Sequence, residues 1–110
     1  MNYSVATAKS ARQDMLQAAK YIAEKLYNPT AADRLLDEAD EAICSLEEQP
    51  MRYPLVRDEY LANLGIRLLP VRNYLVFYVV REKSHSVTVL RFLYGKRDWA
   101  SILRGETKPE

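Results

Sequence analysis

The sequence predicts an α+β fold, in which a short N-terminal strand and a helical hairpin pack on a small antiparallel β-sheet, with a short C-terminal helix. Two observations predict it. Apolar residues recur every three or four positions through most of residues 8–49, which is the period of helices with one buried face. From Gly65 the composition changes to β-branched and aromatic residues, which favour strands.

The first elements are a short strand and a helix. Tyr3 to Ala6 alternates weakly and fits a strand. From about Ala8 one apolar stripe predicts a helix that ends near Tyr27. The residues of this stripe are Ala11, Met15, Ala18, Ala19, Ile22, Ala23 and Leu26.

A second helix follows almost at once. Asn28-Pro29 stops the first helix and can open the next, with Asn28 as N-cap and Pro29 at the first helical position. Thr30 with Asp33 is a competing cap. A second apolar stripe with an acidic opposite face continues until Gln49-Pro50 ends the helix. So short a turn predicts an antiparallel hairpin of the two helices.

The second half reads as a loop followed by three strands. Residues 51–63 show no period and are expected to be a loop. Tyr74 to Val80 is apolar on both faces, which predicts a central strand covered on both sides. The other expected elements are a strand at 66–71 with Pro70 at an edge or bulge, a polar turn at 81–86, a return strand at 87–94, a helical turn or two at 98–104 and a polar tail at 105–110.

Length and composition limit the classes of function. The 110 residues predict a single domain, 1–110. Cys44 is the only cysteine and His85 the only histidine, so we expect no disulfide, no metal site and no cofactor. We expect Cys44 to be a small core residue and His85 to be solvated in its turn. The start lacks an apolar signal segment and no run could span a bilayer, so we expect a cytoplasmic protein without membrane contact.

Charge is divided between the two halves. Residues 1–50 hold five Lys and Arg against nine Asp and Glu, whereas residues 51–110 hold eleven against six. The basic half can face a polyanion or an acidic partner, or the two halves can simply attract each other across the fold.

The basic residues of the second half are the candidates for function. Strand alternation places Arg91 on the same face as Val87, Val89 and Leu93, where a charge is unexpected. Several basic residues from consecutive elements should lie close together: Arg67, Arg72, Arg81, Arg91, Lys96 and Arg97. Arginines beside tyrosine and tryptophan suit phosphate contact with base stacking, or the binding of an acidic peptide. The target-binding candidates are Lys96, Arg97, Trp99, Arg91 and Tyr94.

Several segments, in this order, resemble the RelE/ParE superfamily of bacterial type II toxin–antitoxin toxins. They are the short first strand, the hairpin with Tyr27-Asn28-Pro29-Thr30, Pro50-x-x-Tyr53-Pro54, Asn73-Tyr74-Leu75-Val76-Phe77-Tyr78 and Leu90-Arg91-Phe92-Leu93-Tyr94-Gly95-Lys96-Arg97-Asp98-Trp99. The resemblance covers nearly the whole chain. It implies a bacterial protein that arrests growth, a role in plasmid stabilisation, and a cognate antitoxin that neutralises it in a toxin–antitoxin hetero-oligomer.

The two branches of the superfamily imply different mechanisms. RelE-like toxins cleave mRNA on the ribosome with strand lysines, a third-strand arginine, and an arginine and a tyrosine near the C-terminus. Here the arginine and tyrosine positions fall at Leu75 and Leu103, the lysines fall near Ile66 and Leu68 on either side of Arg67, and only Arg97 keeps its type. The histidine-tyrosine pair of the YoeB pattern is also missing. By elimination the sequence resembles the ParE-like branch, which implies inhibition by binding DNA gyrase.

Three hypotheses therefore remain. The first is a toxin that binds a target such as DNA gyrase, without catalysis. The second is a ribosome-dependent mRNA endonuclease, whose site would be drawn from Arg97, Arg91, Tyr94 and Arg67. The third is an inactive family member that only binds its antitoxin.

Overall fold

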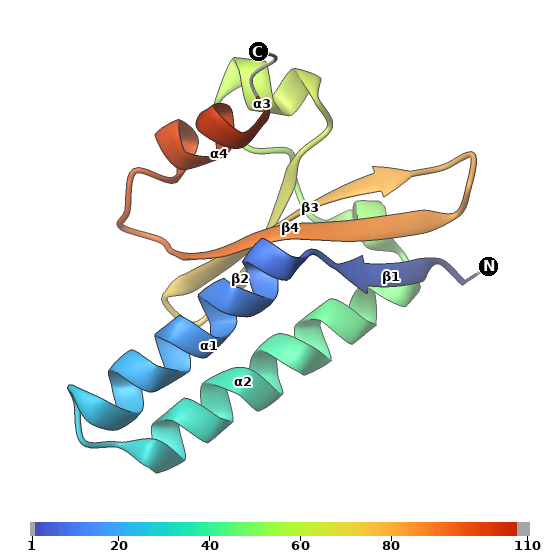
Figure 1. Ribbon diagram of the computed structural model, residues 1–110. Helices are drawn as coiled ribbons and strands as arrows, with labels where there is room; N and C mark the ends of the chain where they lie inside the picture. Colours follow the sequence, from blue (N-terminus) through green and yellow to red (C-terminus); the bar gives the residue numbers. More distant parts are fainter. Residues whose placement is uncertain (1, 108–110) are drawn as a thin grey trace.

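A computed structural model describes residues 2–107 and shows a four-stranded sheet between two layers of helices (Figure 1). The elements are β1 (Ser4–Thr7), α1 (Lys9–Glu24), α2 (Pro29–Cys44), the 3-10 turns η1 (Ser45–Glu47) and η2 (Pro50–Arg52), α3 (Glu59–Asn63), β2 (Arg67–Val71), β3 (Tyr74–Arg81), β4 (Ser86–Tyr94) and α4 (Trp99–Thr107). The hairpin of α1 and α2 covers one face of the sheet, and α3 and α4 lie on the other (Figure 1).

The helical hairpin forms as its two apolar stripes predict. Ala11, Met15 and Ala18 of α1 pack with Leu35 and Ala39 of α2 in one buried cluster. Asn28 is the N-cap of α2, because its side chain accepts a hydrogen bond from the Ala31 amide at 3.1 Å. Both helices are shorter than predicted, since α1 ends at Glu24 and α2 at Cys44, after which the chain tightens into η1.

At the tip of the hairpin, Tyr27 has a left-handed backbone with φ of 53° and is 88% exposed. A bulky residue seldom adopts this conformation, which glycine would adopt without strain.

The sheet order is β1-β4-β3-β2. Strands β2, β3 and β4 are antiparallel, as predicted, whereas β1 is added parallel to β4, with Val5 opposite Val87. The sheet is therefore mixed. The whole central part of β3 is buried: Val76 and Tyr78 face the helical hairpin, and Phe77 faces α3 and α4. This confirms the prediction that both faces of β3 are covered.

Three predictions about local structure are wrong. The segment 51–63 is more than a loop, because it contains η2 and α3, the latter capped by Asp58, whose side chain accepts from the Leu61 amide at 3.0 Å. The last helix continues through Gly105 to Thr107, so only residues 108–110 of the expected tail remain, and these lie outside the described residues. Cys44 is exposed at the end of α2.

His85 is exposed in the turn before β4, as expected, and its ring lies edge-on to Tyr3, with ring centroids 5.3 Å apart. No helix within residues 2–107 is long and apolar enough to cross a membrane.

Candidate binding groove

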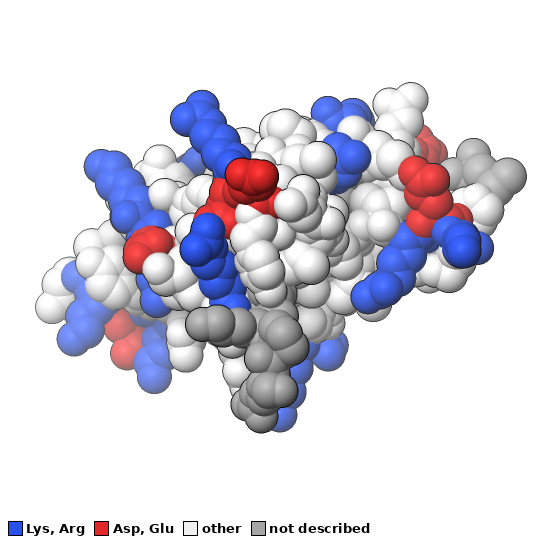
Figure 2. All heavy atoms as spheres, turned by 90° about the horizontal axis from the view of Figure 1, so that it is seen from above, with Lys and Arg blue, Asp and Glu red and all other residues white. Residues whose placement is uncertain are grey.

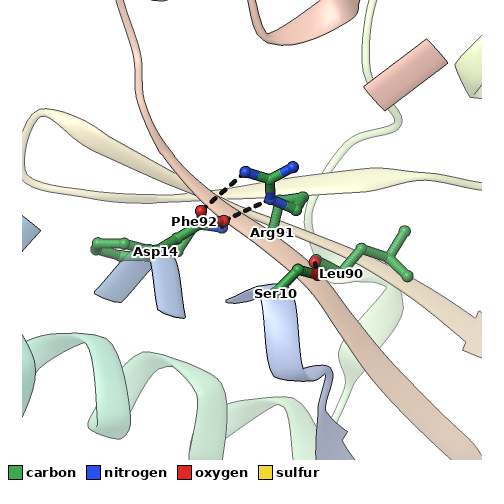
Figure 3. A network of polar contacts seen from close by, with 5 residues as sticks. All are labelled: Ser10, Asp14, Leu90, Arg91 and Phe92. Carbon is green, nitrogen blue, oxygen red and sulfur yellow. Dashed lines mark hydrogen bonds and ion pairs between the residues drawn. The ribbon is translucent and has the colours of Figure 1, made fainter. Parts of the chain in front are cut away.

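The first half of α1 covers the edge of β4 that the short strand β1 leaves open. Beyond Thr7, the backbone amide of Ala8 donates to Val89 O at 2.9 Å and the Ser10 hydroxyl donates to Leu90 O at 3.1 Å. One turn further on, Asp14 accepts from the Phe92 amide at 3.1 Å (Figure 3). The helix therefore satisfies backbone groups of β4 that would otherwise lack a partner.

Asp14 also binds Arg91 in a two-pronged ion pair. Arg91 Nε donates to Asp14 Oδ2 at 2.6 Å and Nη2 donates to Oδ1 at 2.8 Å (Figure 3). The side chains are only 15% and 9% exposed, so both charges are largely removed from water. A paired geometry of this kind is the strong form of an arginine–carboxylate contact.

The predicted alternation of β4 is right in placing Arg91 on the face of Leu93 and wrong in placing it with Val87 and Val89. A register shift between Phe77 and Tyr78 leaves Leu90 without an opposite partner, so the alternation of β4 changes at this bulge. Val87 and Val89 consequently pack towards the helical hairpin, while Leu93 packs in the cluster on the other face. Arg91 lies opposite Phe77 and turns to Asp14 at the edge of the strand.

Beside this ion pair lies a groove of about 630 Å³ between α1 and the adjoining ends of β3 and β4. It is lined by Asp14, Gln17, Ala18, Tyr21, Ile22, Leu26, Asn73, Tyr74, Phe92, Tyr94 and Arg97. We call it the α1 groove. Its volume lies in the range of sites that bind small ligands or a few side chains of a partner.

One wall of the α1 groove is aromatic. Tyr74 stacks on Phe92 with ring centroids 5.0 Å apart and an interplanar angle of 4°, and Tyr94 meets Tyr74 edge-on at 5.6 Å. Burial, followed by the nearby phenols of Tyr94 and Tyr21, raises the pKa of Tyr74. The Tyr74 phenol therefore stays neutral, as a hydrogen-bond donor, throughout the physiological range.

The residues predicted from the sequence separate into two groups. Arg97 and Tyr94 line the α1 groove, and Lys96 is exposed on the same turn but outside the lining. Trp99 instead packs on Phe77 on the opposite face of the sheet, with ring centroids 5.2 Å apart, where it anchors α4.

Arg67 lies elsewhere, at a distance from the groove. Its Nη1 donates to the carbonyls of Met51 and Tyr53 at 3.2 and 2.6 Å, so it fixes the segment before α3. The neighbouring Tyr78 hydroxyl donates to Pro50 O at 2.5 Å, and burial raises the pKa of Tyr78 to about 12. Both side chains hold the η2 segment against the sheet.

The six basic residues predicted to lie close together do not all meet at one site. The turn at Arg72 does lie beside the turn that carries Lys96 and Arg97, because the Gly95 amide donates to Asn73 O at 2.8 Å. Arg72 pairs with Glu38 of α2 at 2.6 Å, Arg91 pairs with Asp14, and Arg67 binds backbone carbonyls. Arg81 ends β3 at the opposite end from Tyr74, so it lies roughly 20 Å from the α1 groove along the strand. On the face seen in Figure 2, Lys and Arg side chains are spread out with Asp and Glu between them.

Sequence reasoning missed three contributors to the groove, Asp14, Tyr21 and Tyr74. Tyr74 belongs to a strand that is apolar on both faces, and strand alternation does not show where a covering helix ends. Asp14 and Tyr21 flank the apolar stripe of α1. The one signal that could have pointed to Asp14 is the charge of Arg91 on a strand, because such a charge requires an acidic partner.

The fold is shared with chains of known toxin–antitoxin structures. The structure resembles one titled "Chromosomal ParDE TA system from P. aeruginosa", with a TM-score of 0.69, 14% identity, and coverage of 84% of this chain and 95% of the other. It also resembles the toxin–antitoxin complex RelBE2 from Mycobacterium tuberculosis, with a TM-score of 0.64, 20% identity, and coverage of 86% and 99%. A search of curated proteins gives no match.

Fold and sequence together define a toxin of the RelE/ParE superfamily. Residues 5–99 match the family model described as the ParE toxin of the type II toxin–antitoxin system parDE. The chain belongs to this ParE toxin family.

Proposed function

We propose that this protein is a toxin that arrests bacterial growth by binding a protein target and not by cleaving mRNA. The target that we propose is DNA gyrase. The observation that carries the proposal is that the positions of the RelE-like catalytic groups are apolar and packed. Leu103, at the tyrosine position, is fully buried, and Leu75, at the arginine position, packs in the same cluster beneath α3 and α4. Ile66 and Leu68, near the lysine positions, also pack there.

Apolar side chains at these positions supply neither acid–base chemistry nor charge stabilisation. Cleavage of RNA through its 2′-hydroxyl needs a group that removes a proton and groups that stabilise the charge developing on phosphorus. Arg67 and Arg91 keep their charges but use them on backbone carbonyls and on Asp14. Arg97 and Tyr94 remain exposed, in a groove suited to binding.

The proposed partner is a cognate antitoxin. Both similar structures are titled as toxin–antitoxin systems, ParDE and RelBE2. We propose that an antitoxin encoded beside this chain binds it in a cytoplasmic hetero-oligomer and neutralises it. Induction without the antitoxin should stop growth, and co-induction of the neighbouring reading frame should restore it. Harmless induction of a folded protein would instead favour the inactive family member.

A supercoiling assay tests the proposed target. Purified protein at increasing concentration is added to DNA gyrase, ATP and relaxed plasmid, and the topoisomers are resolved on a gel. We expect supercoiling to be lost, and the Arg97→Gln and Tyr94→Ala variants to require at least about tenfold more protein if the α1 groove contacts the target. Arg81→Gln, which changes an exposed arginine at the far end of β3, is the matched control.

A second candidate function is supported by one observation, the juxtaposition of Arg97 and Tyr94 in the α1 groove. These could contact a phosphate and a base in a ribosome-dependent mRNA endonuclease. In a translating extract, cuts at codon positions that disappear with Arg97→Ala would establish this activity. Such cuts, together with intact supercoiling at excess protein, would overturn the proposal of gyrase binding.

A further inference from the structure

Only some of the polar side chains that line the α1 groove already make hydrogen bonds within the protein. Its acidic side chain, Asp14, already accepts hydrogen bonds from Arg91 and from the Phe92 amide. The other polar side chains of the lining make no hydrogen bond or ion pair within the described residues, and every one of them can donate a hydrogen bond. They are Gln17, Tyr21, Asn73, Tyr74, Tyr94 and Arg97.

Arg97 is the one side chain of this set that can only donate, whereas the tyrosine hydroxyls and the amide groups of Gln17 and Asn73 can donate or accept. Arg97 is the cation among these donors, and the phenols of Tyr21, Tyr74 and Tyr94 lie on the same side of the molecule. A carboxylate has only acceptor atoms, and its hydrogen bonds with an arginine and with phenols are charge-assisted. A carboxylate can therefore pair with Arg97 and accept from the neighbouring phenols at the same time.

The remainder of the lining is apolar. Ala18, Ile22 and Leu26 of α1 face the aromatic wall formed by Tyr74 and Phe92. An aliphatic or aromatic side chain inserted between these walls would remove apolar surface from water on both sides. Tyrosine and arginine are also the residue types that dominate the energetics of protein interfaces.

We propose that the α1 groove binds a segment of a partner protein in which an apolar anchor lies within a few residues of an aspartate or glutamate. The anchor inserts between α1 and the aromatic wall, and the carboxylate binds Arg97 and the neighbouring phenols. This inference rests on the proposed function, because a toxin that acts and is neutralised through protein contacts needs such a surface.

The same observations disfavour a nucleic acid in this groove. Binding to a phosphate backbone depends on neutralising several phosphates at once. The groove offers Arg97 as its uncompensated cation within the described lining and places the Asp14 carboxylate beside it.

Selection from a random peptide library tests the proposal without knowledge of the partner. Dodecamer peptides displayed on phage are selected on the immobilised full-length protein, and enriched peptides are synthesised with a fluorophore and titrated by anisotropy. We expect enriched sequences that combine Leu, Ile or Phe with Asp or Glu. Arg97→Gln should weaken their binding by about tenfold, the loss expected for one charge-assisted hydrogen bond.

Lys96→Gln is the matched control, because it removes the same charge from an exposed neighbour that does not line the groove. It should change the affinity by less than about twofold. Replacing the acidic residue of the peptide by its amide should weaken binding to the wild type by about tenfold, with little further loss on Arg97→Gln. Non-additivity of this kind shows that the two groups contact each other.

Several results would overturn the inference. For the library, these are a selection that enriches no peptide or enriches peptides without acidic residues. For the variants, they are equal losses of peptide affinity with Arg97→Gln and Lys96→Gln, or additive losses when Arg97→Gln is combined with the amide peptide. Displacement of the peptides by a single-stranded RNA dodecamer would also overturn it. The supercoiling assay is independent of this readout. Inhibition of gyrase without peptide binding overturns this inference alone, whereas peptide binding without inhibition overturns only the proposed target.

Discussion

Asp14 is the residue on which the geometry of the α1 groove most depends. Its carboxylate holds the Arg91 guanidinium and the Phe92 amide, so it joins the helix to β4 at the point where the strand bulges. A guanidinium that is 15% exposed would be costly without this partner. The pair therefore belongs to the framework that positions Tyr74, Tyr94 and Arg97, and we do not assign Arg91 a direct contact with a target.

Replacing Asp14 by asparagine should lower the free energy of unfolding by about 2 kcal/mol, because a largely buried arginine loses its counterion. Arg72→Gln is a suitable control. It breaks the Arg72–Glu38 pair, whose side chains are 51% and 43% exposed, and should lower the free energy of unfolding far less than Asp14→Asn does. Urea denaturation followed by circular dichroism measures both. Equal losses would show that burial of the Asp14–Arg91 pair has no energetic role.

At the level of elements, α3 and α4 are linked by one carboxylate. Asp58 caps α3 through the Leu61 amide, and its Oδ2 also binds Arg104 of α4 at 2.6 Å. The hydrogen bond from Leu61, and after it the one from Arg104, lowers the pKa of Asp58. A lowered pKa means that the ionised carboxylate of Asp58 stabilises the folded state. This stabilisation is fully present above the pKa that Asp58 has in the unfolded chain. It is lost as the pH falls through the lower pKa that Asp58 has in the folded protein.

Asp58→Asn tests this link, since asparagine can still cap the helix but cannot titrate. The variant should be less stable than the wild type at pH 7, and the difference should shrink as the pH is lowered from about 5 towards 2. Urea denaturation at several pH values gives the two curves. A difference that stays constant across this range would show that Asp58 does not contribute through its charge.

At the scale of the whole molecule, the sheet separates two apolar clusters. The cluster beneath the hairpin includes Ile43, and the one beneath α3 and α4 includes Ile66. Ile43→Val and Ile66→Val should each cost about 1 kcal/mol. Their double variant should lose the sum to within about 0.5 kcal/mol, because the two residues pack in separate clusters on opposite faces of the sheet. Denaturation midpoints measure this, and a large departure from additivity would mean that β3 transmits strain between its faces.

The elements that could be predicted are those with local causes. The cap at Asn28 and the strand at Tyr74 to Val80 depend on neighbouring residues, and both are present. The parallel pairing of β1 with β4, the bulge beside Arg91 and the short helix α3 were missed. The first two depend on which segments meet in space, and α3 has too few residues to show a period. The α1 groove was predicted only through Arg97 and Tyr94, because its other wall comes from a helix distant in sequence.

The pairing of β1 with β4 has a consequence for biosynthesis. Val5 and Val87 are opposite each other although about 80 residues separate them in the chain. At ribosomal rates of about 5–20 residues per second, β1 waits on the order of 4–16 s before its neighbour emerges. Closing so long a segment of chain is also the slow kind of contact in folding. A nascent chain that stops before Ser86 cannot complete this sheet, so the four-stranded fold is confined to molecules whose translation has passed β4.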